Sequence, residues 1–176
     1  LWDPLLISLD DEYSLLVPDL PGFGKSPVPE GPYMKVYADA VFDMLDKEDI
    51  DRAVVIGHSM GGYVALEMAA ARPKRIEALG LVHSHPYADS EAQRDSRQKA
   101  IRVVNEKGAA FYIKQFIPGL FHSTTDRLIV KATIASLEAQ SAEGLVAGQQ
   151  AMLQREDRSG VLEKASFPVL VLQGAH

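Results

Sequence analysis

The chain has 176 residues, 47% of them hydrophobic, which fits one globular unit with a substantial core. Its net charge is −6 and its acidic and basic residues are mixed along the chain, which excludes the basic footprint of a protein that binds nucleic acid or an anionic membrane. The absence of cysteine excludes disulfides and thiolate metal sites, and we take the cytoplasm as the default location.

The first residues, LWDPLLISLDDEY, lack the basic start and the long apolar centre of a signal peptide. No apolar run in the rest of the sequence approaches the roughly 20 residues that a membrane-spanning helix needs. We therefore expect no targeting segment and no membrane segment, unless processing has removed one.

Four short apolar runs predict β-strands, at residues 14–18, 53–57, 78–83 and 168–173. Each run is nearly continuous instead of alternating, which is typical of strands covered by helices on both faces of a parallel sheet. Helical patterns lie between the strands, at residues 32–50 and 60–71, and Pro73 prevents the second helix from continuing. This alternation predicts a doubly wound, mostly parallel α/β sheet.

Residues 87–164 break this alternation, because they contain helical patterns and no convincing strand. In the first pattern Ser90 is a candidate N-cap, with Gln93 three residues later and Gly108 as the stop. Further helical patterns follow at residues 109–121, 124–140 and 141–157. A helical insertion of this size predicts a cap (87–164) over the carboxyl edge of a core formed by residues 1–86 and 165–176. Helices packed on the flank of the sheet are the alternative.

The run AVVIGHSMGGYVAL requires a very tight turn, because a predicted strand passes at once into a predicted helix with Ser59 between them. Small residues at Gly57, Gly61 and Gly62 would bring the helix close to the strand and give Ser59 room for strained backbone angles. The sequence GHSMG then fits the G-x-S-x-G pattern of a nucleophile elbow, with a chance match as the alternative. We expect Ser59 to be the nucleophile and the backbone N–H of Met60 to donate to the oxyanion.

From these residues outward, the chain resembles the α/β-hydrolase superfamily, and within it the esterases, peptidases and C–C hydrolases that carry a helical cap. The resemblance rests on YSLLVPDLPGFGKSP, which contains a D-x-x-G-x-G-x-S loop, on VVIGHSMGG, and on REDRSGVLEKASFPVLVLQGAH. It implies an α/β-hydrolase fold and cleavage of an ester, amide or related activated carbonyl of a small molecule through an acyl-enzyme on Ser59. It implies no cofactor and no metal, and a serine at position 59 disfavours the dehalogenase and epoxide-hydrolase branches.

Such families also use an acid, a histidine and a second oxyanion donor that this sequence does not show. The acid usually follows a strand in a G-x-x-D pattern, and here Gly174, Ala175 and His176 occupy the place just before it. Because an unassisted serine hydroxyl is a weak nucleophile, we expect the chain to be a piece of an enzyme.

The histidines of the sequence offer no evident base for Ser59. His58 directly precedes Ser59 on the same strand, where alternation points it away from the serine, so we expect it to pack beside the elbow and to bind substrate there, not to act as the base. His83 and His85 lie at the end of the third predicted strand, on the active edge of the sheet, where we expect them to contact the substrate or support the cap.

Three residues in the predicted cap have two interpretations each. Asp89 could be an alternative catalytic acid, or it could cap the first helix together with Ser90. Phe111 and Phe116 could form the wall of an apolar acyl pocket, or they could fasten the cap to the core.

Several functions remain open at this point. A non-catalytic α/β-hydrolase-fold protein that binds a ligand is the main alternative to a serine hydrolase. Among enzymes, a proline iminopeptidase, a C–C hydrolase and a cofactor-free haloperoxidase have similar elbows. We expect a small-molecule substrate and a monomer or homodimer.

Overall fold

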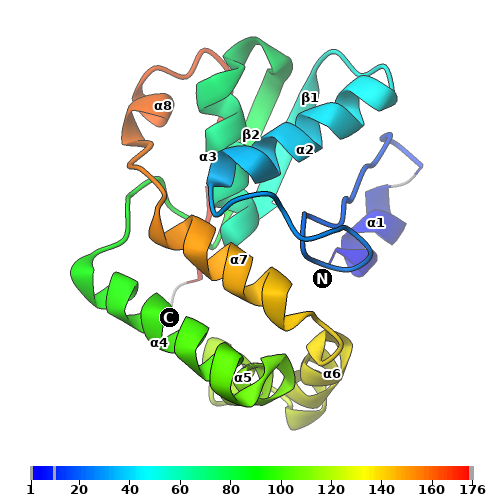
Figure 1. Cartoon of the computed structure of the whole chain (residues 1–176). Coiled ribbons are helices and arrows are strands. Elements are labelled where there is room, and N and C mark those ends of the chain that lie inside the picture. The colour runs from blue at the N-terminus through cyan, green and yellow to red at the C-terminus, as the bar shows by residue number, and fades with distance from the viewer. Residues whose placement is uncertain (1, 10, 175–176) are drawn as a thin grey trace.

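Three parallel strands form the centre of the computed structural model, which describes residues 2–9 and 11–174 (Figure 1). They are β1 (Ala53–His58), β2 (Ile76–Val82) and β3 (Val169–Leu172), in the order β1-β2-β3. The strands predicted from the apolar runs at 53–57, 78–83 and 168–173 are confirmed, with ends that differ by one or two residues.

Two helices cover one face of this sheet, α2 (Met34–Lys47) and α3 (Met60–Ala71). Their inward side chains form the main core with the strands, and the fully buried members include Tyr37, Phe42, Leu66, Met68, Leu79 and Leu81. The helix predicted at 60–71 is confirmed, and Pro73 opens a short 3-10 turn, η1 (Pro73–Arg75).

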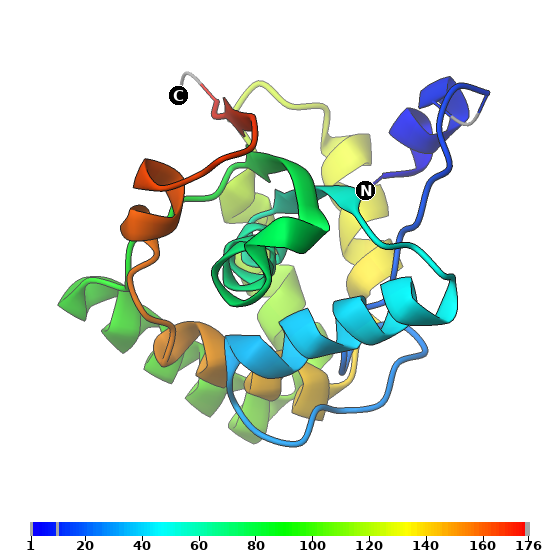
Figure 2. The same cartoon turned by 90° about the horizontal axis from the view of Figure 1, so that it is seen from above.

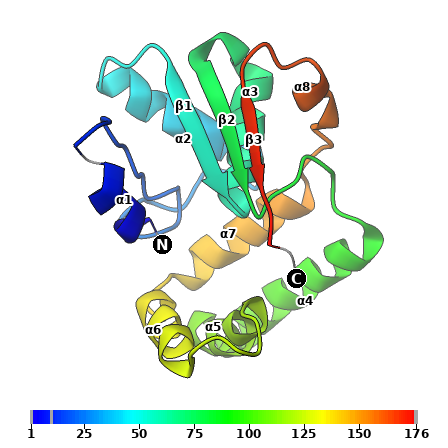
Figure 3. The same ribbon diagram turned by 180° about the vertical axis from the view of Figure 1, so that it is seen from behind.

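The opposite face of the sheet is open within the described part of the chain, as Figure 3 shows from behind. Val54, Ile56 and Leu170 point to this face and are 57%, 47% and 55% exposed. The expectation of helices on both faces is therefore met on one face only. Beyond the two edges lie α1 (Asp3–Leu9), on the β1 side, and α8 (Ser159–Glu163), on the β3 side (Figure 2).

The strand predicted at residues 14–18 is wrong. These residues belong to no strand in the structure, and Leu16 and Val17 are 40% and 50% exposed. A strand exists only where its backbone groups bond to a neighbour, and none of the three strands pairs with this segment. An apolar run alone therefore did not suffice to predict a strand.

The remaining helices gather at the carboxyl end of the sheet (Figure 1, Figure 3). They are α4 (Glu91–Lys107), α5 (Ala109–Phe116), η2 (Ile117–Leu120), α6 (Arg127–Leu137) and α7 (Ala142–Leu153). The predicted capping box is confirmed, because Ser90 N–H donates to Gln93 Oε1 at 2.8 Å and Ser90 Oγ accepts from Gln93 N–H. Gly108 ends α4 at φ 85°, as predicted.

Two helices connect this group to the sheet. Helix α7 packs on α3, and so does α8, which lies inside the segment predicted as the cap. Ala109, Ile113 and Ile117 form a second, small core that is separate from the main one. The division of the chain into a core and a cap stays a prediction.

Candidate active site

Ser59 lies at the tip of the turn between β1 and α3, with φ 51° and ψ −116°. A positive φ is costly for a residue with a Cβ, by about 1–3 kcal/mol, and persists only where the surroundings enforce it. Ser59 is also exposed. The structure therefore has the strained, accessible serine that the G-x-S-x-G pattern predicts.

Hydrogen bonds fix the backbone of Ser59 from three sides. Its N–H donates to the carbonyl of Val82 on β2 at 2.9 Å. Its carbonyl accepts from the N–H of Gly62 at 3.0 Å and from the hydroxyl of Ser84 at 3.0 Å. These bonds account for the strained conformation.

Two of the three glycines in the motif are required by close packing. A Cβ at Gly57 would overlap the carbonyl of Gly61, and a Cβ at Gly62 would overlap the side chain of Ser84. A Cβ at Gly61 would meet no atom in the described structure. The expectation that Gly61 must be small for the helix to approach the strand is therefore not supported.

The amide of Met60 is placed for the predicted oxyanion role. Met60 is the first residue of α3, and the first N–H groups of a helix have no acceptor within the helix. Within residues 2–9 and 11–174 no backbone carbonyl accepts from this N–H. It is free to bind an anion at the positive end of the helix dipole.

Helix α7 packs closely on the elbow and on the glycine turn that precedes α2. A Cβ at Gly148 would lie 3.3 Å from Met60 Sδ and 3.2 Å from the ring of Phe23. A Cβ at Gly22 would lie only 2.9 Å from the Cα of Gly144. The two glycines of α7 therefore allow this helix to approach the turn at Ser59.

His58 and His83 lie together at the carboxyl ends of β1 and β2. Their ring centroids are 6.0 Å apart, and burial followed by the nearby His83 lowers the pKa of His58 below its usual value of 6.5. His83 is exposed and has φ 46°. In the described chain neither ring is hydrogen bonded to the hydroxyl of Ser59, so their predicted contact with substrate stays a prediction.

His85 points toward α3. Its Nε2 lies 3.3 Å from the hydroxyl of Tyr63, and its ring stacks on Tyr87 with a centroid distance of 5.8 Å. Burial, followed by the positive charge of Arg155, lowers the pKa of His85. His85 is therefore favoured in its neutral form, and its substrate contact also stays a prediction.

The two phenylalanines predicted for substrate binding lie on α5. Phe111 is 41% exposed and lies under Lys107, whose Nζ is 4.8 Å from the ring centroid. Phe116 is 45% exposed and stacks on Tyr112 at 5.2 Å. Neither lines a hollow that the structure describes, and their role in an acyl pocket stays a prediction.

A buried ion cluster was missed from the sequence. The carboxylate of Asp89 is completely buried and accepts from Arg97 Nε at 2.5 Å and from Arg155 Nη1 at 2.6 Å. Burial alone would raise the pKa of Asp89, but hydrogen bonds from the two guanidinium groups outweigh it and lower the pKa. Because both oxygens are engaged by arginines, the structure favours a structural role for Asp89 over the alternative of a catalytic acid.

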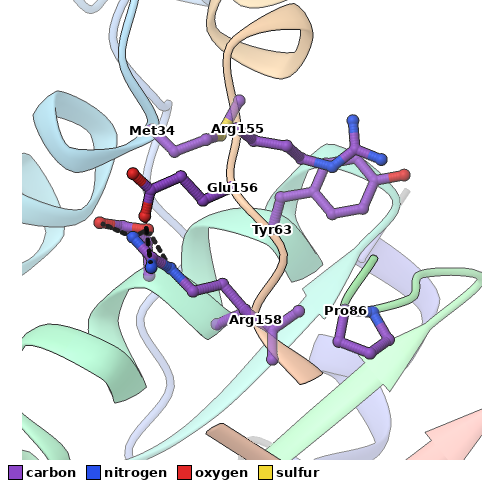
Figure 4. A pocket seen from close by; sticks show the side chains of 8 residues that line it. Met34, Tyr63, Pro86, Arg155, Glu156 and Arg158 are labelled. Carbon is purple, nitrogen blue, oxygen red and sulfur yellow. Dashed lines mark hydrogen bonds and ion pairs between the residues drawn. The ribbon is translucent and has the colours of Figure 1, made fainter. Parts of the chain in front are cut away.

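Beside this cluster lies a small hollow, drawn in Figure 4, that is lined by residues from α2, α3, the loop before α4 and the segment after α7. The guanidinium of Arg155 lies over the ring of Tyr63, with 4.0 Å from Cζ to the centroid. Arg158 donates to both carboxylate oxygens of Glu67 at 2.9 and 3.1 Å. A second hollow lies between residues 28–32 and helices α4 and α7. Ser59 lines neither hollow.

The rest of the predicted catalytic machinery falls outside these observations. Ala175 and His176 lie outside the described residues, so the structure says nothing of the predicted place of the acid. Among the residues that it does describe, no three His, Asp or Glu side chains are grouped to hold a metal, and no helix is long and apolar enough to cross a bilayer.

The chain is similar to one protein family and to several proteins with known names. The model of a family described as the alpha/beta hydrolase fold matches residues 1–176. RutD of Yersinia enterocolitica, named as a candidate carbamate hydrolase, is 27% identical over 97% of this chain and 63% of its own length. The 3-oxoadipate enol-lactonase 1 of Acinetobacter baylyi is 27% identical over 99% of this chain and 65% of its own length.

One solved structure is also similar to this chain. A thermophilic esterase from Thermogutta terrifontis matches with a TM-score of 0.86 and 27% identity, over 97% of this chain and 64% of that one. The chain thus spans between 63% and 65% of the length of these three proteins.

Proposed function

Because the chain belongs to the alpha/beta hydrolase fold family, we propose that it forms the nucleophile-bearing part of a serine hydrolase. The observation that carries this proposal is the strained backbone of exposed Ser59, at φ 51°, between β1 and α3. Such backbone strain is found where a side chain must project from the end of a strand, as the serine of a nucleophile elbow does.

In the proposed reaction Ser59 Oγ attacks the carbonyl carbon of the substrate and forms an acyl-enzyme. A histidine takes the proton of the hydroxyl and passes it to the leaving group, and water then releases the acid. The chain spans 63–65% of the length of its relatives, and we assign this histidine to the part of the protein beyond these 176 residues. The amide of Met60 donates to the oxyanion as it forms.

The chemistry of the site and the names of the relatives support one substrate class. The enol-lactonase and the esterase are named for ester bonds, one of them cyclic. A carboxylic ester of a small molecule is therefore the substrate class that we propose, with amides and C–C bonds next to an activated carbonyl as the alternatives. His83 and His85, at the carboxyl end of β2, are the residues that we propose to contact it.

The proposal is tested on the whole protein with p-nitrophenyl acetate, p-nitrophenyl butyrate and proline p-nitroanilide. We expect hydrolysis of the esters, and its loss in a Ser59→Ala variant whose melting temperature shows that it is folded. Preference for the proline amide would identify a peptidase. A folded wild-type protein that turns over none of the three would favour the non-catalytic alternative, a ligand-binding protein.

A further inference from the structure

We propose that Ser84 is a positioning residue for the oxyanion donor. Its hydroxyl would act through the peptide group that joins Ser59 to Met60 and would not touch the substrate. This inference rests on the proposed function, because it assigns a role in the same reaction.

Ser84 lies directly beneath the elbow. It is 2% exposed, and its hydroxyl donates to the carbonyl of Ser59 at 3.0 Å. The absence of a side chain at Gly62 makes room for it, since a Cβ there would overlap Ser84. A buried hydroxyl needs a hydrogen-bond partner, and this one has the carbonyl of Ser59.

The chain on both sides of Ser84 is built to hold it there. The preceding residue, His83, has φ 46°, and this left-handed conformation redirects the chain as it leaves β2. The carbonyl of Ser84 accepts from the side chain of Gln173, just after β3, at 2.8 Å. Ser84 therefore links the carboxyl ends of β2 and β3 to the nucleophile turn.

The peptide group explains how this contact would affect the reaction. The carbonyl of Ser59 and the N–H of Met60 belong to one planar amide, so a hydrogen bond that fixes the carbonyl also fixes the direction of the N–H. A donor at the carbonyl oxygen also polarises the amide, which makes the N–H a stronger donor. A well-aimed and polarised N–H stabilises the substrate oxygen more strongly as negative charge develops on it.

The test compares Ser84→Ala with Ser84→Thr, which keeps the hydroxyl, in the whole protein. We expect Ser84→Ala to lower kcat for p-nitrophenyl butyrate roughly five- to tenfold, as loss of about one hydrogen bond implies, with KM unchanged. A boronic acid, which mimics the tetrahedral intermediate, should bind more weakly by the same factor. Ser84→Thr should restore both. Ser136→Ala is the matched control, because its hydroxyl also donates to a carbonyl, that of Thr133 at 2.8 Å, but on α6.

A second readout does not depend on turnover. The chain has five methionines, so selective ¹⁵N labelling of methionine gives few amide signals. The signal that disappears in Met60→Leu is that of the Met60 amide. We expect the Met60 amide proton to move to higher field in Ser84→Ala, as its amide loses polarisation, and not in Ser136→Ala.

The outcomes are distinct. If Ser84→Ala lowers only the melting temperature, while kcat and boronic acid affinity stay within twofold of an active wild type, the inference is wrong and the proposed function stands. If the wild type neither hydrolyses esters nor binds the boronic acid, the proposed function fails and the inference fails with it.

Discussion

A Ser59→Gly variant is expected to lose hydrolysis and to become more stable. Removal of the nucleophile should lower kcat by about a thousandfold or more. Glycine adopts the left-handed φ of 51° without a steric penalty, so the strain is released, while the unfolded chain gains some freedom. We expect a net gain of about 1 kcal/mol in the free energy of unfolding, or roughly 2–4 °C in melting temperature.

Ser59→Ala is the matched control for this prediction. Alanine also removes the hydroxyl, but it keeps a Cβ and therefore keeps the strain. We expect the same loss of activity with no gain in melting temperature. Equal melting temperatures for the glycine and alanine variants would show that the elbow stores no strain.

Replacement of Asp89 by asparagine is expected to give the largest loss of stability. The variant leaves the guanidinium groups of Arg97 and Arg155 buried without a counter-charge, and breaking a buried ion pair in this way costs about 3–5 kcal/mol. Denaturant unfolding measures the loss. The control is Glu138→Gln, which breaks an exposed pair with Lys114 at 3.3 Å and should cost less than about 1 kcal/mol.

The same cluster predicts a pH dependence. The pKa of Asp89 is lower in the folded protein than its usual value of 3.8, so the folded state favours the charged carboxylate. Its contribution to stability is complete above that usual value and is lost as the pH falls through the lowered value. The difference in stability between the wild type and Asp89→Asn should therefore be constant near neutral pH and shrink below about pH 4. A difference that does not change on acidification would contradict the ionic assignment.

The features that could be predicted from the sequence are those fixed by neighbours along the chain. Gly57, Ser59 and Gly62 lie within six residues, and together they determine the tight turn between β1 and α3. The capping box of Ser90 and Gln93 is also local, because its two partners are three residues apart. The strand predicted at 14–18 failed because pairing depends on a neighbour in space, which an apolar run does not reveal.

The features that were missed depend on contacts between distant residues. Asp89 meets Arg155 across 66 positions, and Ser84 meets Ser59 across 25. A serine after a strand or an arginine after a helix is too common to identify such a contact alone. Asp89 and Arg97 are only eight residues apart, but Asp89 lies before the N-cap of α4, so no helical spacing marks the pair, and the sequence could not show that the aspartate is buried.

The most direct test of the central claim is to locate the site of covalent modification. The whole protein is treated with a fluorophosphonate probe, and the modified peptide is identified by mass spectrometry. We predict one adduct, on Ser59, which disappears in Ser59→Ala and persists in Ser136→Ala. An adduct on a different residue, or none on the folded protein, would contradict the assignment of Ser59 as the nucleophile.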